Sequence, residues 1–560
     1  MVLNLRRYGV LSFLVAFVAL IVWHWQIELV SPHRKADSDA LEQTQSDPQR
    51  GRLLYQNGQL ASGEQVVGML MGGTPLSAEQ ASCASCHRPS AMGSSEGDEI
   101  VPALRGDLLF QDLRLPTRKP PHTPVLRPAY SLETLRDAIR NGVASDGTSL
   151  GSMMPRYALS DEQIDDLVTY LRSLPMQADP GVDQAEIHFA TILSNGVDPA
   201  MRTAILDVFA QFLNQKNSDS RHDSQRAEHA PWHKAWSMES YRKWKLHVWE
   251  LQGSAKSWPA QLERYYAEQP VFAVLNGFVE GDWQPIHGFC EDRQIPCLFP
   301  TTDLPVLDKT GHFAFYLDRG MAGQAAALAE RLLSMLEPGG EVLQVYRAED
   351  ARSERARGTL RASLEAFDLK IEDQELTGSE LDRVLDGLPV SSDLVLWLGQ
   401  SELGVIWPKL LDREFSGRIY LSTSLYGTEF ESIPSDLRAQ AYFLHPYAMP
   451  ERMPVQLRRA QIWMHRSQIA AADFQRVQAN AFFTLTETGI ALKKIGGFWF
   501  RDYFMEGIEH AIDNTVFTSV YPRLSLAPGQ RFVSMGLYLF RLVDKGAGKP
   551  EPEVDWAIQF

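Results

Sequence analysis

The chain has 560 residues, of which 44% are hydrophobic and 22% are charged. A chain of this length is too long for one compact core, which excludes a single small domain. The composition is typical of folded protein, which excludes extensive disorder. The formal net charge of −16 argues against nucleic acid as a partner, because binding to phosphates needs an excess of Lys and Arg.

The N-terminus carries an apolar run from Tyr8 to Trp25, preceded by Arg6 and Arg7. This run is longer than the core of about 7–15 residues in a signal peptide and reaches the lower limit of about 17 for a membrane-spanning helix. We therefore interpret residues 1–33 as an uncleaved anchor, with a cleaved signal as the alternative. Under either interpretation, the residues that follow the apolar run are exported from the cytoplasm. The positive-inside rule then places the anchor in the inner (cytoplasmic) membrane with the soluble domains facing the periplasm. Residues 34–50 follow as a polar linker.

Cys83, Cys86 and His87 form the sequence C-x-x-C-H, which is the attachment sequence of c-type haem. Two thiols three positions apart can each add to one vinyl group of the same porphyrin, and the adjacent imidazole can then reach the iron. A structural zinc site would need a second Cys or His pair nearby, and a redox C-x-x-C site would need a βαβ context; the surrounding sequence supplies neither. The motif predicts one covalently bound haem c with His87 as an axial ligand of the iron.

The region around this motif, residues 48–176, resembles class I cytochrome c domains. The resemblance rests on Met154-Pro155, on a helix that begins after Ser160 and contains Tyr170-Leu171, and on the segment Gly51–Tyr55, which is similar to the family's N-terminal helix. It implies an all-α domain over residues 51–176. It also implies Met154 as the second axial ligand, and a hydrogen bond from the proximal His87 to the carbonyl of Pro102. The 27 residues between Tyr55 and Cys83 exceed the family's shortest members, so an extra loop is expected there.

Two alternatives to Met154 remain for the second axial position. Met153 is its neighbour and is interpreted as a packing residue, because Met often fills irregular gaps. His122, within a proline-rich segment, would give bis-histidine iron with a lower potential. Ligation by Met and His fills both axial positions, which suits electron transfer better than oxygen chemistry.

After a linker at residues 177–185, short apolar segments alternate with helical patterns. Such alternation predicts parallel sheets with helices on both faces. Two series of this kind predict two α/β lobes within residues 186–545, followed by a C-terminal tail at 546–560. The expected strands are 187–193, 246–251, 271–275, 296–299, 342–346, 394–398 and 418–421, and the expected helices are 199–212, 259–268, 352–367 and 403–411.

Residues 186–545 resemble type I periplasmic solute-binding proteins, specifically the branched-chain amino acid and amide receptor group. The matching segments are Val274–Gly277, Ile295–Pro300 and Asp318–Gly320. The resemblance implies a solute cleft to which Gly277 and the loop Ser422, Thr423 and Ser424 contribute. One departure is that Phe278-Val279-Glu280-Gly281 replaces the family's Ser or Thr, and Glu280 would repel a carboxylate.

Two further features have alternative interpretations. Cys290 and Cys297 favour a disulfide in an exported protein, with two buried reduced thiols as the alternative. The polar segment 218–245 contains His222, His229, His233, Trp232 and Trp236. Its spacing matches no ligand pattern, so a solvated excursion is favoured over a metal site.

Together these features predict a membrane-anchored electron-transfer protein. The second module would dock a periplasmic redox protein or dehydrogenase, or bind a small organic solute. The alternative is a receptor or sensor of an exported small molecule in which the haem has a secondary role. No nucleophile–base pair or phosphate-binding loop stands out, so we do not expect an enzyme.

Overall fold

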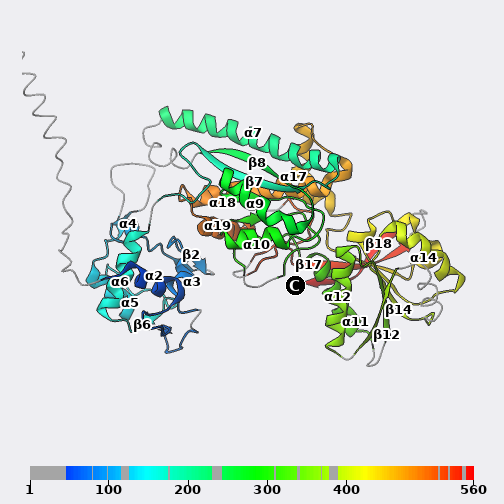
Figure 1. The fold of residues 1–560 in the computed structure, drawn as a ribbon, viewed down its shortest axis with the longest axis horizontal. Helices are drawn as coiled ribbons and strands as arrows, with labels where there is room; N and C mark the ends of the chain where they lie inside the picture. The colour runs from blue at the N-terminus through cyan, green and yellow to red at the C-terminus, as the bar shows by residue number, and fades with distance from the viewer. Residues whose placement is uncertain are drawn as a thin grey trace, which may run out of the picture.

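The computed structural model describes residues 46–77, 80–96, 99–114, 125–174, 177–229, 242–307, 311–336, 341–367, 369–376, 389–514, 518–526, 530–544 and 550–559. Along the chain they form a small helical domain followed by two α/β lobes (Figure 1). The predicted anchor at residues 1–33 and most of the linker at 34–50 lie outside these ranges. Within the ranges, no helix combines the length and the apolar character that crossing a bilayer requires.

The helical domain contains five helices and three two-stranded sheets among the described residues. The first helix begins at Pro48, inside the predicted linker, because Asp47 caps it: its Oδ1 accepts from the Gln49 amide at 2.8 Å. The helices are α2 (Pro48–Asn57), α3 (Cys83–His87), α4 (Gly106–Leu109), α5 (Leu132–Asn141) and α6 (Asp161–Ser173), and the strand pairs are β1 (Gly68–Met69) with β6 (Arg156–Tyr157), β2 (Ser94–Glu96) with β3 (Glu99–Val101), and β4 (Leu113–Arg114) with β5 (Val125–Arg127).

Helices α2 and α6 cross in close contact at Gly51. A Cβ atom added to Gly51 would lie 2.1 Å from the carbonyl oxygen of Asp166 and 2.8 Å from Cβ of Tyr170. One turn further along α2, the ring of Tyr55 lies 5.5 Å from the ring of Tyr170, measured between centroids. The pairing of N-terminal and C-terminal helices that the cytochrome resemblance implies is therefore present.

The extra loop expected between Tyr55 and Cys83 braces the segment that contains Met154. Its strand β1 pairs antiparallel with β6, which places Gly68 opposite Tyr157 and Met69 opposite Arg156. The space beside Gly68 is filled by Tyr157 and Pro155, whose nearest atoms lie 3.0 and 3.1 Å from an added Cβ. The loop thus holds the chain immediately after Met154.

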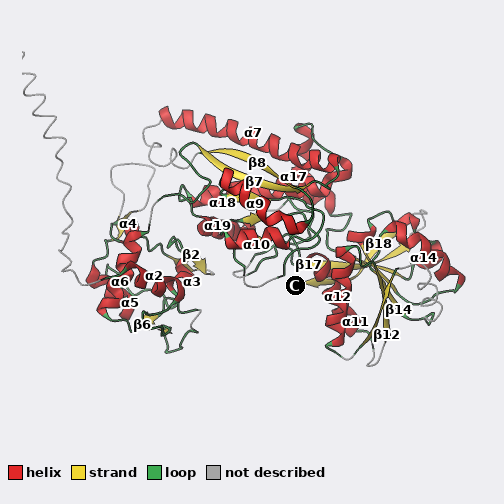
Figure 2. Cartoon of the chain, viewed as in Figure 1, coloured by secondary structure: helices red, strands yellow, loops and turns green. Residues whose placement is uncertain are grey.

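Lobe one contains a five-stranded, fully parallel sheet in the order β11-β10-β9-β7-β8. Helices cover both faces, as predicted (Figure 2). The strands are β7 (Glu186–Ser194), β8 (Lys243–Leu251), β9 (Ala273–Leu275), β10 (Cys297–Leu298) and β11 (Ala314–Phe315); the helices are α7 (Pro199–His229), α9 (Trp258–Glu268), α10 (Gln284–Asp292), and, from later in the chain, α17 (Met453–Arg466), α18 (Gln475–Ile495) and α19 (Arg501–Asn514).

Helix α7 corrects one expectation. It continues 17 residues beyond the predicted end at residue 212, into the segment interpreted as a solvated excursion. Few apolar residues follow Leu213, and so periodicity alone could not extend the prediction. The predicted disulfide is present: Cys290 on α10 is bonded to Cys297 on β10, and both residues are buried.

Lobe two contains a seven-stranded sheet in the order β13-β12-β14-β15-β16-β17-β18. Helix α14 packs on one face, and α11 and α12 pack on the other. The strands are β12 (Glu341–Tyr346), β13 (Lys370–Glu375), β14 (Asp393–Leu396), β15 (Ile419–Ser422), β16 (Ala441–His445), β17 (Gly536–Asp544) and β18 (Pro550–Gln559); the helices are α11 (Gly320–Leu333), α12 (Ala351–Glu365) and α14 (Gln400–Asp412), with the single turns α15 (Thr423–Tyr426) and α16 (Ser435–Arg438).

The last two strands of this sheet correct the predicted C-terminal tail at 546–560. Strands β17 and β18 pair antiparallel, and β17 also pairs antiparallel with β16, so the sheet is mixed and not purely parallel. Strand β18 contains Pro550 and Pro552. Because β18 is an edge strand with one neighbour, a proline that lacks an N–H group costs it little there.

We predict that Gly51→Ala destabilises the helical domain by about 1–3 kcal/mol, because the added methyl group has no space against the α6 backbone. Amide hydrogen exchange in α2 and α6, measured by mass spectrometry on the full chain, should accelerate about five- to 150-fold. The control is Arg52→Ala at the neighbouring exposed position. Equal protection in Gly51→Ala and the unmodified protein would contradict the close helix crossing.

Candidate functional site

The helical domain encloses an apolar cavity of about 390 Å³. Cys83, Cys86 and His87 line it from one element, α3, and Met154 lines it from the loop before β6. This volume falls in the range of about 300–1,000 Å³ that is usual for sites of small molecules and cofactors. The remaining lining is mostly aliphatic and aromatic and includes Leu54, Tyr55, Val66, Pro102, Leu104, Leu109, Leu135, Ile139, Tyr157, Leu167 and Leu171.

His87 is held in one orientation and one tautomer. Its Nδ1 lies 2.8 Å from the carbonyl oxygen of Pro102, which can only accept, so Nδ1 carries the hydrogen and Nε2 keeps its lone pair. Burial lowers the pKa of His87 to about 4, against the opposing effect of the bond to Pro102. The imidazole is therefore neutral near pH 7 and able to bind a metal. This is the contact that the cytochrome resemblance implies for Pro102.

Cys83 and Cys86 are unbridged thiols at the cavity wall, and both are partly buried. Burial raises the pKa of Cys83 to about 12, so this residue is a neutral thiol at physiological pH. Two thiols, a nearby neutral imidazole and an apolar chamber fit an iron porphyrin that is attached through thioether bonds. A zinc site fits these residues less well, because a thiol of raised pKa, as at Cys83, binds zinc poorly.

Met154 is positioned by the chain on both sides of it. Its amide donates to the carbonyl of Gly151 at 3.2 Å, and its own carbonyl accepts a close hydrogen bond from Nη1 of Arg156. The Arg156 guanidinium occupies the space beside Gly142, whose φ of +72° and missing side chain allow this contact. Met153 is 56% exposed at the cavity mouth. His122 lies outside the described residues.

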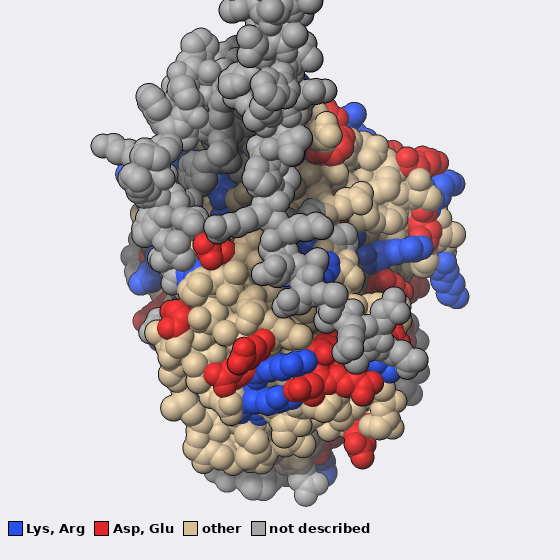
Figure 3. Space-filling view, turned by 90° about the vertical axis from the view of Figure 1, so that its left-hand side faces the viewer, with Lys and Arg blue, Asp and Glu red and all other residues tan. Residues whose placement is uncertain are grey.

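The mouth of the cavity is apolar and open. Ile100, Leu113 and Met153 all line the cavity, and they are 83%, 41% and 56% exposed. Figure 3 views the end of the molecule that carries the helical domain and shows a broad area without charge beside charged groups of both signs. Large exposed apolar side chains around one cavity are typical of an interaction site.

The helical domain contacts lobe one through α19. Arg88, which directly follows His87, forms ion pairs with Glu506 and with Glu509, the latter at 3.4 Å. The Ser90 amide donates to Oδ2 of Asp502 at 2.7 Å. Burial raises the pKa of Glu509 to about 7 despite the nearby guanidinium of Arg88. Lobe one thus contacts the segment after α3 while the cavity mouth stays exposed.

A stacked cation adds to this contact. The guanidinium carbon of Arg105 lies 4.4 Å from the centroid of the Phe500 ring, and its nitrogens donate to the carbonyls of Ser90 and Leu174 at 3.0 and 3.2 Å. Arg105 is 1% exposed. No local pattern in the sequence indicates this role of Arg105.

The predicted solute-cleft residues have other roles in the structure. Ser422 and Thr423 are buried, and their hydroxyl groups bond to Gln324 Oε1 at 2.6 Å and to His445 Nδ1 at 2.9 Å. Ser424 is half-buried and accepts from Nε2 of Gln324 at 2.9 Å. Gly277 has φ +116°, and its carbonyl accepts from the Thr301 amide at 2.9 Å. Of these four residues, none lines the crevice described next.

Lobe two has a polar crevice of about 450 Å³ where sequence analysis placed no site. It lies beyond the carboxyl ends of β12 and β14, between which the strand order reverses. Such a switch point is where open α/β sheets bind ligands. Strand order, which decides this position, cannot be derived from the sequence alone. The lining residues are Arg347, Asp350, Arg352, Ser353, Trp397, Leu398, Gly399, Gln400, Ser401, Glu402, Leu425 and Tyr426.

Charged side chains join the two lobes beside this crevice. Arg352 lies 3.7 Å from Asp303, and Arg355 lies 3.8 Å from Asp282, so the N-terminal half of α12 faces carboxylates of lobe one. Nearby, burial and the charge of Asp303 raise the pKa of Asp318 to about 7. The region therefore offers cationic and anionic groups to a bound polar molecule.

Comparisons with solved structures give distant likenesses. One is a leucine-binding protein from Thermotoga maritima, with 13% identity and a TM-score of 0.45, covering 66% of this chain and 98% of that chain. Another is a branched-chain amino acid ABC transporter from Thermus thermophilus with bound valine, with 13% identity and a TM-score of 0.46, covering 66% and 96%. These TM-scores are below 0.5, so the two-lobed α/β architecture rests on the strand orders described above.

None of the curated proteins matches the chain. The match to a family model coincides with the cavity. Residues 76–175, which include α3, Pro102, Met154 and α6, match the model of the family described as Cytochrome c. This part of the chain is therefore a cytochrome c domain, joined to an α/β module of two lobes.

Proposed function

We propose that the protein is an exported one-electron carrier that holds a single haem c through Cys83 and Cys86, with His87 and Met154 as axial ligands. The observation that supports this proposal is that both thiols, the imidazole and the thioether line one apolar cavity. When bound, the haem supplies an iron that cycles between its ferric and ferrous states. Because protein groups would fill both axial positions, the donor set suits electron transfer.

The chain's own residues would set the properties of this centre. The apolar lining excludes water from the cavity, and the carbonyl of Pro102 orients His87 and increases its basicity. A methionine ligand and low solvent access both favour a raised reduction potential. Arg156 holds the backbone of Met154 and so positions its side chain.

A redox partner would dock at the cavity mouth. Ile100, Leu113 and Met153 form an exposed apolar rim that the contact with α19 leaves free. Electron-transfer encounters are typically small and weak, and an apolar rim of this size suits them. The partner would be a periplasmic redox protein or dehydrogenase, and the apolar N-terminal segment would keep the carrier at the inner membrane.

The test of this function is whether the purified protein carries covalently bound haem. In a host that matures c-type cytochromes, the purified chain should keep one haem per molecule after denaturation and extraction with acid acetone. Cys83→Ala combined with Cys86→Ala should abolish this covalent haem, because both thioether bonds are lost. The control replaces Cys290 and Cys297 together, which removes the disulfide and leaves the haem motif intact. Unmodified protein that loses its haem to acid acetone would refute the proposal.

Met154→Ala should remove the weak far-red absorption band of methionine-ligated ferric haem and lower the reduction potential, because the thioether ligand is lost. Met153→Ala is the matched control and should leave both properties unchanged. Spectroscopy and redox titration of the purified full chain check this prediction. An unchanged band in Met154→Ala would assign the position to another methionine, with Met153 tested next, whereas absence of the band from the unmodified protein would favour His122.

A second candidate function is solute binding by the α/β module. It is supported by the crevice at the switch point of lobe two, which carries convergent donors and acceptors next to charged groups of lobe one. The ligand would be a small polar solute with both donor and acceptor groups. Solute binding and electron transfer are compatible in one chain.

Thermal unfolding of the full chain, measured with panels of amino acids, amides, alcohols and aromatic acids, tests this candidate. A solute at a hundredfold excess over its Kd should stabilise the module by about 2.7 kcal/mol. Ser401→Trp should abolish the shift, because it fills the crevice. Val405→Trp, on the same helix at a residue 56% exposed and outside the crevice, should preserve it. The absence of a shift with every class would leave only the docking role.

A further inference from the structure

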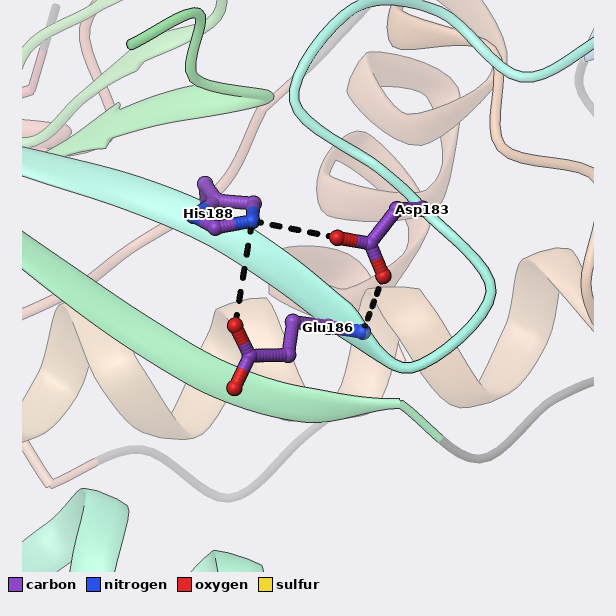
Figure 4. Close-up of side chains that lie close together, drawn as sticks. All are labelled: Asp183, Glu186 and His188. Atoms are coloured by element: carbon purple, nitrogen blue, oxygen red, sulfur yellow. Dashed lines mark hydrogen bonds and ion pairs between the residues drawn. The ribbon is translucent and has the colours of Figure 1, made fainter.

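Three side chains converge near the start of strand β7 in lobe one, on the sheet face covered by α9 and α10. His188 Nε2 lies 3.4 Å from Oδ2 of Asp183 and 4.0 Å from Oε2 of Glu186 (Figure 4). All three ligand atoms lie within 4.8 Å of one another. Glu186 and His188 share a face because they are two residues apart on a strand, and Asp183 reaches them from the linker after the cytochrome domain.

These separations fit a shared cation better than direct hydrogen bonds. A nitrogen–oxygen distance of 3.4 Å is long for a bond to a carboxylate, which is normally about 2.7–2.9 Å. Ligand atoms at about 2.0–2.2 Å from a tetrahedral zinc ion lie about 3.3–3.5 Å apart. The separation between Asp183 and His188 already matches this value. The separation between Glu186 and His188 is about 0.5 Å larger, and the half-buried side chain of Glu186 can turn to shorten it.

Neighbouring residues orient two of the three side chains, Asp183 and His188. The other oxygen of Asp183, Oδ1, accepts from the amides of Ala185 and Glu186 at 2.7 and 2.8 Å, which fixes the carboxylate and lowers its pKa. His188 is only 7% exposed, and its Nδ1 lies 3.0 Å from Nε2 of His247 on β8. Metal-binding histidines usually donate their other ring N–H to an acceptor, and Nε2 of His247 is placed to accept here.

Two tautomers of this histidine pair are possible, and they differ in what they leave unsatisfied. If His247 donates to His188, Nε2–H of His188 meets Asp183 only at the long distance of 3.4 Å. If His188 donates to His247, Nε2 of His188 presents a lone pair to two carboxylates, and a cation between them satisfies all three groups. The second arrangement is complete when a cation lies at Nε2, either a proton that makes His188 an imidazolium or a bound metal ion.

One cation already approaches this group. Nζ of Lys245 lies 3.6 Å from Oε2 of Glu186, and its side chain is 54% exposed. Nε of Arg242 donates to the backbone carbonyl of Asp183 at 2.8 Å. A divalent ion would compete with the flexible ammonium of Lys245 for Glu186. The lysine thus sets the affinity of the site and offers a way to test it.

We propose that Asp183, Glu186 and His188 bind a zinc-like divalent transition metal, with His247 as the acceptor behind His188. One imidazole and two carboxylates favour such an ion over Mg²⁺ or Ca²⁺, which prefer oxygen ligands alone. Three protein ligands leave a fourth position for water. This site is separate from the haem cavity and from the crevice of lobe two.

The bound metal would fasten the interdomain linker to lobe one. Asp183 belongs to the linker, whereas the other two ligands belong to the sheet. Closer to the cytochrome domain, Asp179 is already held: its amide donates to Trp499, and its carboxylate accepts from the Arg501 amide at 2.7 Å. A metal at Asp183 would add a second fixed point and restrain the cytochrome domain against the α/β module.

The test uses the full-length protein, treated with a chelator and then titrated with Zn²⁺ in the presence of a competing chelator of known affinity. Elemental analysis after dialysis should give one zinc per chain in addition to any iron. His188→Ala and the nearly isosteric Glu186→Gln should abolish this binding, and His247→Ala should weaken it about 10- to 100-fold. Lys245→Met should tighten it, because the competing cation is removed.

Two controls separate this site from other histidines. His465→Ala, at an exposed position on α17, should leave zinc binding unchanged. A triple replacement of His222, His229 and His233 should also leave it unchanged. The proposal is overturned if no zinc binds, if His188→Ala and Glu186→Gln bind zinc as the unmodified chain does, or if the triple variant alone loses it. Circular dichroism of each variant checks that the module is folded.

Discussion

The hydrogen bond between His87 Nδ1 and the carbonyl of Pro102 is the contact on which the cofactor site depends. At 2.8 Å it fixes the imidazole in the tautomer that leaves Nε2 free, in a site whose burial keeps the ring neutral. Neither effect is sufficient alone: burial without the carbonyl would leave the ring free to turn, and the carbonyl without burial would favour protonation. The C-x-x-C-H sequence supplies two thiols for attachment and one imidazole for the iron, and this contact orients the imidazole.

The contact between the two modules leaves the apolar rim of the cytochrome domain exposed. Arg88 and Ser90 follow the haem motif, and α19 of lobe one binds both of them. Ile100, Leu113 and Met153 keep large exposed fractions. The module therefore contacts the haem-binding segment without covering these side chains, which suits a carrier that must meet a partner and release it.

The solute-cleft residues that the family resemblance implies stay a prediction. Ser422 and Thr423 follow a lobe-two strand, as the resemblance implies, but their hydroxyl groups bond inside the protein to Gln324 and His445. The direction of a side chain beyond a strand end depends on the helices packed against the sheet. The crevice instead lies beyond β12 and β14, at a position defined by strand order.

The sequence by itself determined the haem attachment motif and the alternation of strands and helices, because both are encoded in local spacing. Met154 and Pro102 followed from the resemblance to cytochrome c domains, and the disulfide was favoured by the exported character of the chain. Tertiary structure decided what depends on distant segments. It added β18 to the sheet, since an edge strand tolerates its prolines, and it extended α7 past its apolar stripe. It also brought Arg88 to Glu509 across 421 residues and His188 to His247 across 59, contacts that no local pattern encodes.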